Sequence, residues 1–236
     1  MNTIVHPSTD RGHADHGWLN AHHSFSFANW YDPARVQFGM LRVLNDDIVS
    51  AGEGFSMHPH NDMEIITIIL SGALEHKDNM GNGSVIRPGD VQVMSAGTGV
   101  HHSEFNPSRD EPTSLFQLWI FPKENGIQPS YDQKTFSKEN RKNKIVAVAS
   151  GYGKGEELYI HQDAMVSLGQ LDKEKSAEYS IVNTGNGAYL MVISGQLNVD
   201  GKILNKRDAI GINGINKFNI SANENTEFLI VDVPMK

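Results

Sequence analysis

Short apolar runs, each closed by glycine, proline, asparagine or aspartate, recur along the whole chain and constrain its fold more than any other feature. None is long enough, or repeats apolar residues at intervals of three and four, to predict a substantial helix. In the segment 23–27, histidine and phenylalanine alternate with serine, the period of two typical of a half-buried strand. The apolar runs are the segments 64–70, 91–94, 115–121, 144–149, 189–193 and 228–233. Many short strands separated by turns predict an all-β protein.

The two halves of the chain repeat the same order of features. The segment 69–74 (ILSGAL) resembles the segment 192–197 (VISGQL). Each half then ends on an apolar run followed by a proline, Pro122 in the first and Pro234 in the second. An approximate duplication of one barrel explains this order. The predicted division is a first lobe, a polar linker and a second lobe, at residues 1–122, 123–144 and 145–236.

Composition excludes several classes of function. The 236 residues include no cysteine, which excludes disulfides, thiolate nucleophiles and zinc ribbons. Acidic side chains outnumber basic ones by 28 to 20, and the formal charge of −8 predicts no nucleic-acid partner because such a surface repels phosphate. Residues 1–20 lack the apolar stretch of a signal peptide, and no apolar run is long enough to span a bilayer. We therefore expect a cytoplasmic monomer that does not bind membranes.

Two pairs of donor side chains stand out, each spaced two residues apart. His58 and His60 flank Pro59, and His102 and Glu104 form the second pair. Residues two apart in a strand share a face, so the side chains of each pair can converge on one point. A proline inside a strand cannot donate to a ladder, which predicts that Pro59 lies on an edge strand or at the mouth of a barrel. Two such strands can present three imidazoles and one carboxylate to a divalent metal.

A single His-x-His pair is weak evidence for a metal, because most histidines have surface or hydrogen-bonding roles. Two pairs of donors on neighbouring strands of one half are a more specific signal. The second half has no equivalent, because the positions corresponding to the first pair and Glu64, counted back from Gly195, are Ile181, Asn183 and Gly187. A metal site is therefore predicted in the first lobe alone.

The first donor pair lies in a pattern that resembles the cupin motif, with a glycine, five residues, His-x-His, three residues and a glutamate. More narrowly, the chain resembles the pirin family, densely from about residue 10 to 130 and loosely beyond. The segments that carry this resemblance are 16–19 (HGWL), 25–29 (FSFAN), 31–33 (YDP), 41–43 (LRV), 45–47 (NDD), 58–60 (HPH) and 94–99 (MSAGTG). It implies a bicupin of two tandem double-stranded β-helix (jelly-roll) barrels, with a metal only in the N-terminal barrel.

The resemblance also implies a ligand set. The pirin ligands map onto His58, His60, His102 and Glu104. The wider cupin motif instead makes its own glutamate, here Glu64, a ligand; we favour Glu104 and expect Glu64 to orient an imidazole N–H. With no thiolate to select zinc, we expect one divalent cation, with Fe²⁺ favoured and Zn²⁺, Ni²⁺, Co²⁺, Mn²⁺ or Cu²⁺ as alternatives.

Pirins of this kind are associated with quercetin 2,3-dioxygenase activity, in which O₂ opens the central ring of a flavonol and carbon monoxide is released. The resemblance therefore implies a flavonol-like ligand and O₂ as partners, with Glu104 as the catalytic acceptor of the flavonol 3-hydroxyl proton. The competing hypothesis is a non-catalytic regulator that senses metal or redox state and acts through a protein partner. A metal-dependent isomerase is a third, because the fold alone does not choose among these functions.

Overall fold

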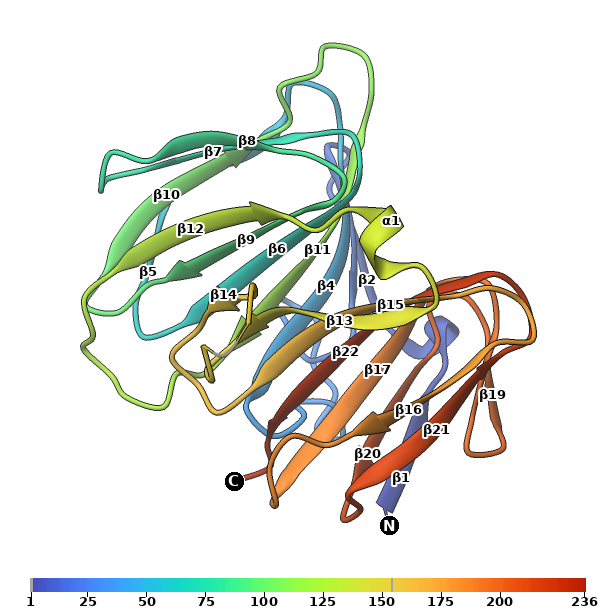
Figure 1. The fold of residues 1–236 in the computed structure, drawn as a ribbon. Helices are drawn as coiled ribbons and strands as arrows, with labels where there is room; N and C mark the ends of the chain where they lie inside the picture. The colour runs from blue at the N-terminus through green and yellow to red at the C-terminus, as the bar shows by residue number, and fades with distance from the viewer. Residues whose placement is uncertain (1, 154) are drawn as a thin grey trace.

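The structure, a computed structural model that describes residues 2–153 and 155–236, is built almost entirely from strands, as predicted (Figure 1). In the described residues, the helical segments are a 3-10 turn, η1 (Ser8–Asp10), and a single short helix, α1 (Lys138–Arg141). No helix in these two ranges is long and apolar enough to cross a bilayer. The strands form two large and two small sheets, in which all but one of the strand pairings are antiparallel.

The first half forms a seven-stranded sheet in the order β12-β9-β6-β11-β4-β3-β2 and a four-stranded sheet in the order β5-β10-β7-β8. Its strands are β2 (Gly12–Asp15), β3 (Leu19–His23), β4 (Leu41–Val49), β5 (Gly54–His60), β6 (Glu64–Ser71), β7 (Leu74–Asp78), β8 (Gly83–Ile86), β9 (Asp90–Ser95), β10 (Val100–Phe105), β11 (Thr113–Ile120) and β12 (Ser130–Thr135). β6 carries the apolar run that follows the first donor pair, and it is buried on both faces over most of its length. A strand of this kind belongs in the middle of a sheet.

The second half repeats this arrangement, with a seven-stranded sheet in the order β1-β20-β17-β22-β15-β13-β14 and a four-stranded sheet in the order β16-β21-β18-β19. Its strands are β1 (Asn2–His6), β13 (Lys144–Ser150), β14 (Leu158–Tyr159), β15 (Met165–Leu171), β16 (Ser176–Ser180), β17 (Asn186–Ser194), β18 (Leu197–Val199), β19 (Lys202–Leu204), β20 (Ala209–Asn213), β21 (Lys217–Ala222) and β22 (Thr226–Pro234). All pairings in its large sheet are antiparallel except that between β13 and β14.

The predicted duplication is confirmed by the strand order and by one matched turn. β6 lies between β9 and β11, and β17 lies between β20 and β22. Each strand is followed by a glycine in the left-handed region, Gly72 with φ 76° and Gly195 with φ 82°. A Cβ on either would collide with a threonine that begins the neighbouring strand, Thr113 or Thr226. The threonine hydroxyl accepts a hydrogen bond from the residue after the glycine, at 3.1 Å in both halves.

Strand pairing and a shared apolar cluster join the two halves, in addition to the connecting segment. β1 comes from the start of the chain but pairs with β20, and β12 lies within the expected linker but pairs with β9. The largest apolar cluster mixes side chains from both halves, among them Phe116, Tyr189 and Val231. The residues between the halves therefore take part in the sheets, and the division at residues 1–122, 123–144 and 145–236 stays a prediction.

Candidate metal centre

The two donor pairs lie on neighbouring strands of the small sheet in the first half. β5 and β10 are antiparallel, with His58 opposite His102 and Pro59 opposite His101. β5 is the edge strand of this sheet, which confirms the position predicted from Pro59. The register shifts between His102 and Glu104. β10 stays in register with β7 across these residues, so the extra residue lies on β5, between Phe55 and His58. Irregularities of this kind are common beside functional sites.

The three predicted imidazoles converge. The ring centroids of His58 and His60 lie 4.8 Å apart, those of His58 and His102 4.4 Å, and those of His60 and His102 5.0 Å. One ring nitrogen from each lies within 4.8 Å of the others. His102 is buried, whereas His58 and His60 are half-buried. The cluster therefore has a closed inner side and an accessible outer side.

The imidazoles also present suitable nitrogen atoms to a metal. The Nδ1 of His58 donates to the carbonyl oxygen of Ser56 at 2.8 Å, which leaves its Nε2 with a lone pair. The Nε2 of His102 is buried and has no hydrogen-bond partner in the described residues. An unpartnered buried polar atom costs free energy, which a bound cation would remove. The three histidines thus fit a metal ion.

Glu104 supplies the acidic oxygen of the same neighbourhood. It forms a second group of potential ligands with His102 and His76, so His102 belongs to both groups. The carboxylate is 2% exposed, and its Oε2 accepts a hydrogen bond from Gln117 at 2.8 Å. Its Oε1 is buried without a hydrogen-bond partner among the described residues. A carboxylate oxygen left unpaired beside imidazoles also fits a cation.

Burial sets the protonation of these groups. Desolvation, with the neighbouring His58 charge as the next cause, lowers the pKa of His60 to about 4 and that of His102 to about 3. Burial raises the pKa of Glu104 above its usual range. A metal binds the neutral form of an imidazole. At neutral pH, His60 and His102 are therefore already neutral and need not lose a proton before they bind a metal ion.

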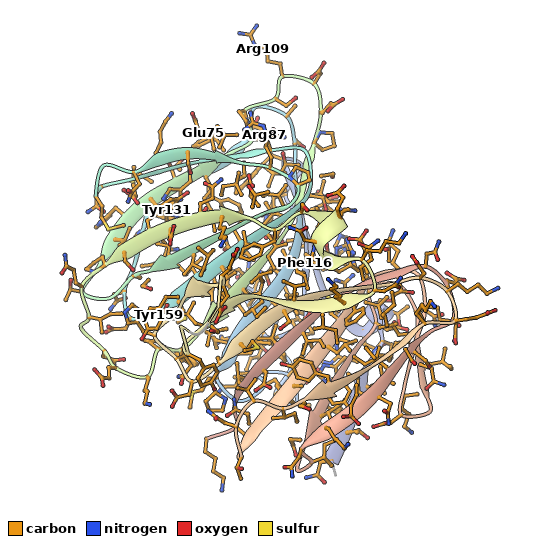
Figure 2. All side chains as sticks on the ribbon, viewed as in Figure 1. Glu75, Arg87, Arg109, Phe116, Tyr131 and Tyr159 are labelled. Atoms are coloured by element: carbon orange, nitrogen blue, oxygen red, sulfur yellow. The ribbon has the colours of Figure 1, made fainter. Side chains whose placement is uncertain are left out.

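His76 was not predicted, although it contacts the centre directly. It is fully buried on β7, with its Nδ1 3.4 Å from the Nδ1 of His102 and its Nε2 3.2 Å from Asp78 Oδ2. Its ring stacks on Tyr131 of β12, which is labelled in Figure 2. These contacts fix the ring of His102. His76 and Asp78 are two residues apart, the same spacing that identified the ligands, but the pairing of β7 with β10 was not visible in the sequence.

Gln117 and Trp119, both on β11, were also missed. Trp119 donates from Nε1 to the Oε1 of Gln117 at 3.2 Å, and Gln117 in turn donates to Glu104. The Trp119 ring meets the His60 ring edge-on, with centroids 4.9 Å apart. Gln117 and Trp119 therefore connect the Glu104 carboxylate to the His60 imidazole from β11, a strand of the large sheet. Their spacing of two residues was the available signal.

Glu64 lies beside a histidine outside the converging set, with its Oε1 3.6 Å from the Nδ1 of His161. Its Oε2 accepts hydrogen bonds from the Ser95 hydroxyl at 2.7 Å and from the backbone N–H of His161 at 3.1 Å. In the described residues its hydrogen-bond partners thus include none of the three converging imidazoles. His161 belongs to the second half, so Glu64 connects the halves.

The matching interior of the second half is apolar. β16 and β21 pair as β5 and β10 do, but the side chains there include Tyr179, Phe218 and Ile220, which belong to a buried apolar cluster. Both groups able to hold a metal among residues 2–153 and 155–236 lie in the first half. The first copy of the duplicated arrangement therefore carries metal donors, and the second is packed with apolar side chains.

Comparison with known proteins matches both halves. The Pirin family model covers residues 5–120, and the model for the quercetinase C-terminal cupin domain covers residues 147–233. The chain is 40% identical to quercetin 2,3-dioxygenase of Escherichia coli over 227 residues, 96% of each chain. It is 44% identical to a pirin-like protein of Caulobacter vibrioides, covering 96% of this chain and 97% of the other. The structure matches the E. coli pirin YhhW in complex with nickel(II) with a TM-score of 0.93 and 39% identity, covering 99% of both chains.

Proposed function

The chain belongs to the pirin family, and from that membership we propose that it is a metal-dependent dioxygenase that opens the central ring of flavonols such as quercetin. The observation that carries the proposal is the convergence of three imidazoles at an accessible strand edge, next to a buried carboxylate with one unpartnered oxygen. The name of the E. coli relative supports the reaction, and the nickel complex of the solved pirin supports the metal.

We assign the metal to His58, His60, His102 and Glu104, since His102 and Glu104 each carry a buried atom without a hydrogen-bond partner among the described residues. Three neutral imidazoles and one carboxylate leave a divalent cation with a net charge of about +1, which suits an anionic oxygen ligand. When bound, the metal supplies a Lewis acid for the flavonol oxygen and a redox-active centre for O₂. Fe²⁺ stays the favoured ion, with Ni²⁺ and the other divalent cations as alternatives.

Glu104 is the group proposed to accept the proton of the flavonol 3-hydroxyl. Burial makes its carboxylate more basic than an exposed one. The hydrogen bond from Gln117 holds one oxygen and fixes the plane of the group. His58 and His60 form the exposed rim through which a flat substrate enters, and Trp119 packs edge-on against His60 on that side.

The reaction is tested by adding quercetin in air to protein loaded in turn with iron, nickel, cobalt, manganese and copper. We expect carbon monoxide to appear in proportion to the quercetin consumed with at least one of these metals. Release with none of them would contradict the dioxygenase proposal. The regulator that acts through a protein partner would then be the better hypothesis.

The role of Glu104 is tested by Glu104→Gln, which keeps an oxygen donor of similar size and removes the basicity. Turnover of quercetin should fall by roughly 100-fold or more, the usual effect of losing a general base. The metal content should fall less than in a variant that lacks a histidine ligand.

The matched control is Glu64→Gln, the same change at a buried carboxylate whose hydrogen bonds go to Ser95 and His161. It should keep its turnover. If Glu104→Gln is fully active and Glu64→Gln is inactive, the wrong carboxylate has been assigned.

A further inference from the structure

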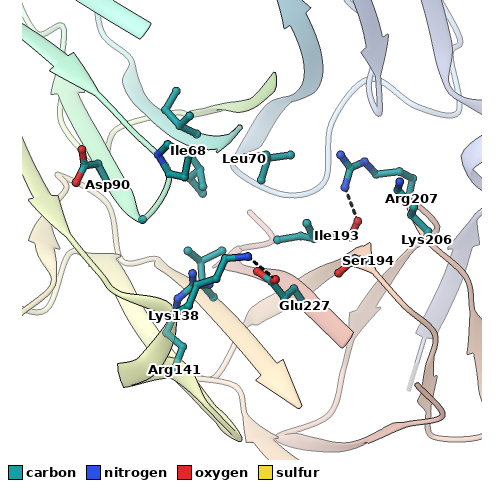
Figure 3. A pocket seen from close by; sticks show the side chains of 14 residues that line it. Ile68, Leu70, Asp90, Lys138, Arg141, Ile193, Ser194, Lys206, Arg207 and Glu227 are labelled. Carbon is teal, nitrogen blue, oxygen red and sulfur yellow. Dashed lines mark hydrogen bonds and ion pairs between the residues drawn. The ribbon is translucent and has the colours of Figure 1, made fainter. Parts of the chain in front are cut away.

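A cavity of about 210 Å³ lies at the junction of the two halves, on the side where α1 connects them (Figures 1 and 3). Ile68 and Leu70 of β6 face it from the first half, and Leu168 and Ile193 face it from the second. Two charged side chains of α1, Lys138 and Arg141, complete one end. None of the candidate metal ligands lines this cavity.

Arg141 is the unusual residue of this cavity. The residue is only 3% exposed, whereas arginine is almost never fully buried unless its charge is paired. Its Nε is fully buried and has no hydrogen-bond partner among the residues that the structure describes, and the nearby carboxylates of Glu227 and Glu139 act on the guanidinium by charge alone. Burial lowers its pKa, while the charges of Glu227 and Glu139 act in the opposite direction. A buried guanidinium without partners fits a site that an anion completes.

The other charged groups around the cavity are already paired or exposed. Lys138 forms an ion pair with Glu227 at 2.7 Å, which Figure 3 shows as a dashed line. Arg207 is half-buried and forms an ion pair with Asp46 at 2.8 Å, a carboxylate that it shares with Arg11. Asp90 accepts a hydrogen bond from the backbone N–H of Arg87 at 2.9 Å. The uncompensated charge that faces the cavity from a buried position is therefore that of Arg141.

Arg141 also borders a second cavity, of about 350 Å³, on its other side. Of the described residues that line that cavity, two are carboxylates, Glu156 and Glu157, and two are cations, Lys134 and Arg141. An anion there would meet as many negative as positive side chains. In the first cavity, four cationic side chains face two carboxylates, so an anion is favoured on that side.

We propose that the cavity at the junction of the halves binds a small organic monocarboxylate, whose carboxylate pairs with the guanidinium of Arg141. The planar fork of an arginine matches the two oxygens of a carboxylate. The apolar body of the ligand lies against Ile68, Leu70, Leu168 and Ile193, which an inorganic anion could not use. One uncompensated buried cation matches one negative charge. This site is independent of the proposed dioxygenase reaction.

The test is calorimetric titration of the metal-loaded protein with benzoate, which carries one carboxylate on a small apolar ring. Benzamide has the same shape without the charge, and inorganic phosphate has charge without the apolar body. We expect benzoate to bind at one site, and Arg141→Met to weaken it by about 10-fold or more through loss of a charged hydrogen bond. Lys142→Met, which removes an exposed cation one residue away, should bind as the natural chain does.

One further variant, together with the two control ligands, separates the alternatives. His102→Ala lacks a proposed metal ligand and should keep benzoate binding, so binding that disappears with His102 would place benzoate at the metal and overturn this proposal. Benzamide binding as tightly as benzoate, or equal benzoate binding by Arg141→Met, would also overturn it. If phosphate binds in a way that depends on Arg141 and benzoate does not bind, the proposal that the ligand is an organic carboxylate is overturned.

Stability distinguishes a ligand-binding arginine from a structural one. An unpartnered buried charge destabilises the ligand-free fold, so Arg141→Met should raise the melting temperature. The rise should be about 2–4 °C if the free energy of unfolding increases by the amount typical of one hydrogen bond. A fall in melting temperature without loss of benzoate binding would contradict the proposal. If Arg141→Met does not fold, a crystal of the natural chain with 4-bromobenzoate decides, because the anomalous bromine signal must lie in this cavity and a signal elsewhere, or none, refutes the site.

Discussion

At the scale of single residues, His102 is the central side chain of the candidate metal centre. It is buried, it belongs to both groups of potential ligands, and its Nδ1 lies 3.4 Å from His76 while its Nε2 has no partner in the described residues. The adjacent His101 on the same strand points the other way and is exposed. Alternation along one strand has thus given two neighbouring histidines opposite environments.

That contrast supplies a matched pair of variants. His102→Ala should cut metal occupancy by about 10-fold or more, because a lost donor cannot be replaced without moving a strand. His101→Ala should retain the occupancy of the natural chain. Metal content per chain by mass spectrometry measures both, and equal occupancy in the two variants would contradict the assignment.

Spacing along the chain was enough to find the residues that share one strand face, and less useful for those that meet across strands. His58 with His60, and His102 with Glu104, were predicted because each pair needs only the alternation of one strand. The contact of His76 with His102 depends on the register between β7 and β10, which the sequence does not display. Glu64 has the inward parity of a ligand, but its partner His161 comes from the other half.

At the scale of the elements, the strands that connect the halves are those whose sequences carry the least signal. β12 reads SYDQKT and is exposed or half-buried along its length, so no alternation of apolar residues marks it as a strand. β1 is exposed at every position except His6. Both strands lie at the edge of their sheets, where one face does not need to be apolar. The all-β class and the duplication were predictable because the central strands β6 and β17 are strongly apolar.

β1 ends in a histidine that makes stability depend on pH. The Nδ1 of His6 lies 2.9 Å from the Tyr189 hydroxyl, and burial, with the Arg35 charge as the next cause, lowers the pKa of His6 to about 4. Between pH 6.5 and 4 the unfolded chain therefore binds a proton that the folded chain does not. The free energy of unfolding should fall as the pH falls through this range, by at most about 3 kcal/mol from this residue.

His6→Gln removes the titration, so the free energy of unfolding should depend less steeply on pH than in the natural chain. Denaturant unfolding of metal-free protein at pH 7 and at pH 4 measures the difference. His16→Gln, at an exposed position, is the control and should keep the original dependence. An unchanged dependence in His6→Gln would show that this histidine does not titrate as described.

At the scale of the whole molecule, the two halves share one large core. Its buried side chains come from β4, β6 and β11 in the first half and from β15, β17 and β22 in the second. Glu64 and His161 add a polar contact across the same junction. Neither half can lose its structure without exposing apolar surface of the other, which couples them energetically.

We therefore expect the metal-free chain to unfold in a single transition, with calorimetric and van't Hoff enthalpies that agree. Scanning calorimetry measures both. Two resolved transitions, each with about half of the total enthalpy, would show that the halves are independent units despite their common core.

We propose that one metal ion lies among His58, His60, His102 and Glu104. Anomalous diffraction at the absorption edge of the loaded metal locates that ion directly. We predict one peak per chain, within bonding distance of all four side chains, at about 2.0–2.2 Å if the ion is of first-row transition-metal size. A peak held by His76 in place of His58 and His60, a second peak in the other half, or no peak in protein exposed to excess metal would contradict the account.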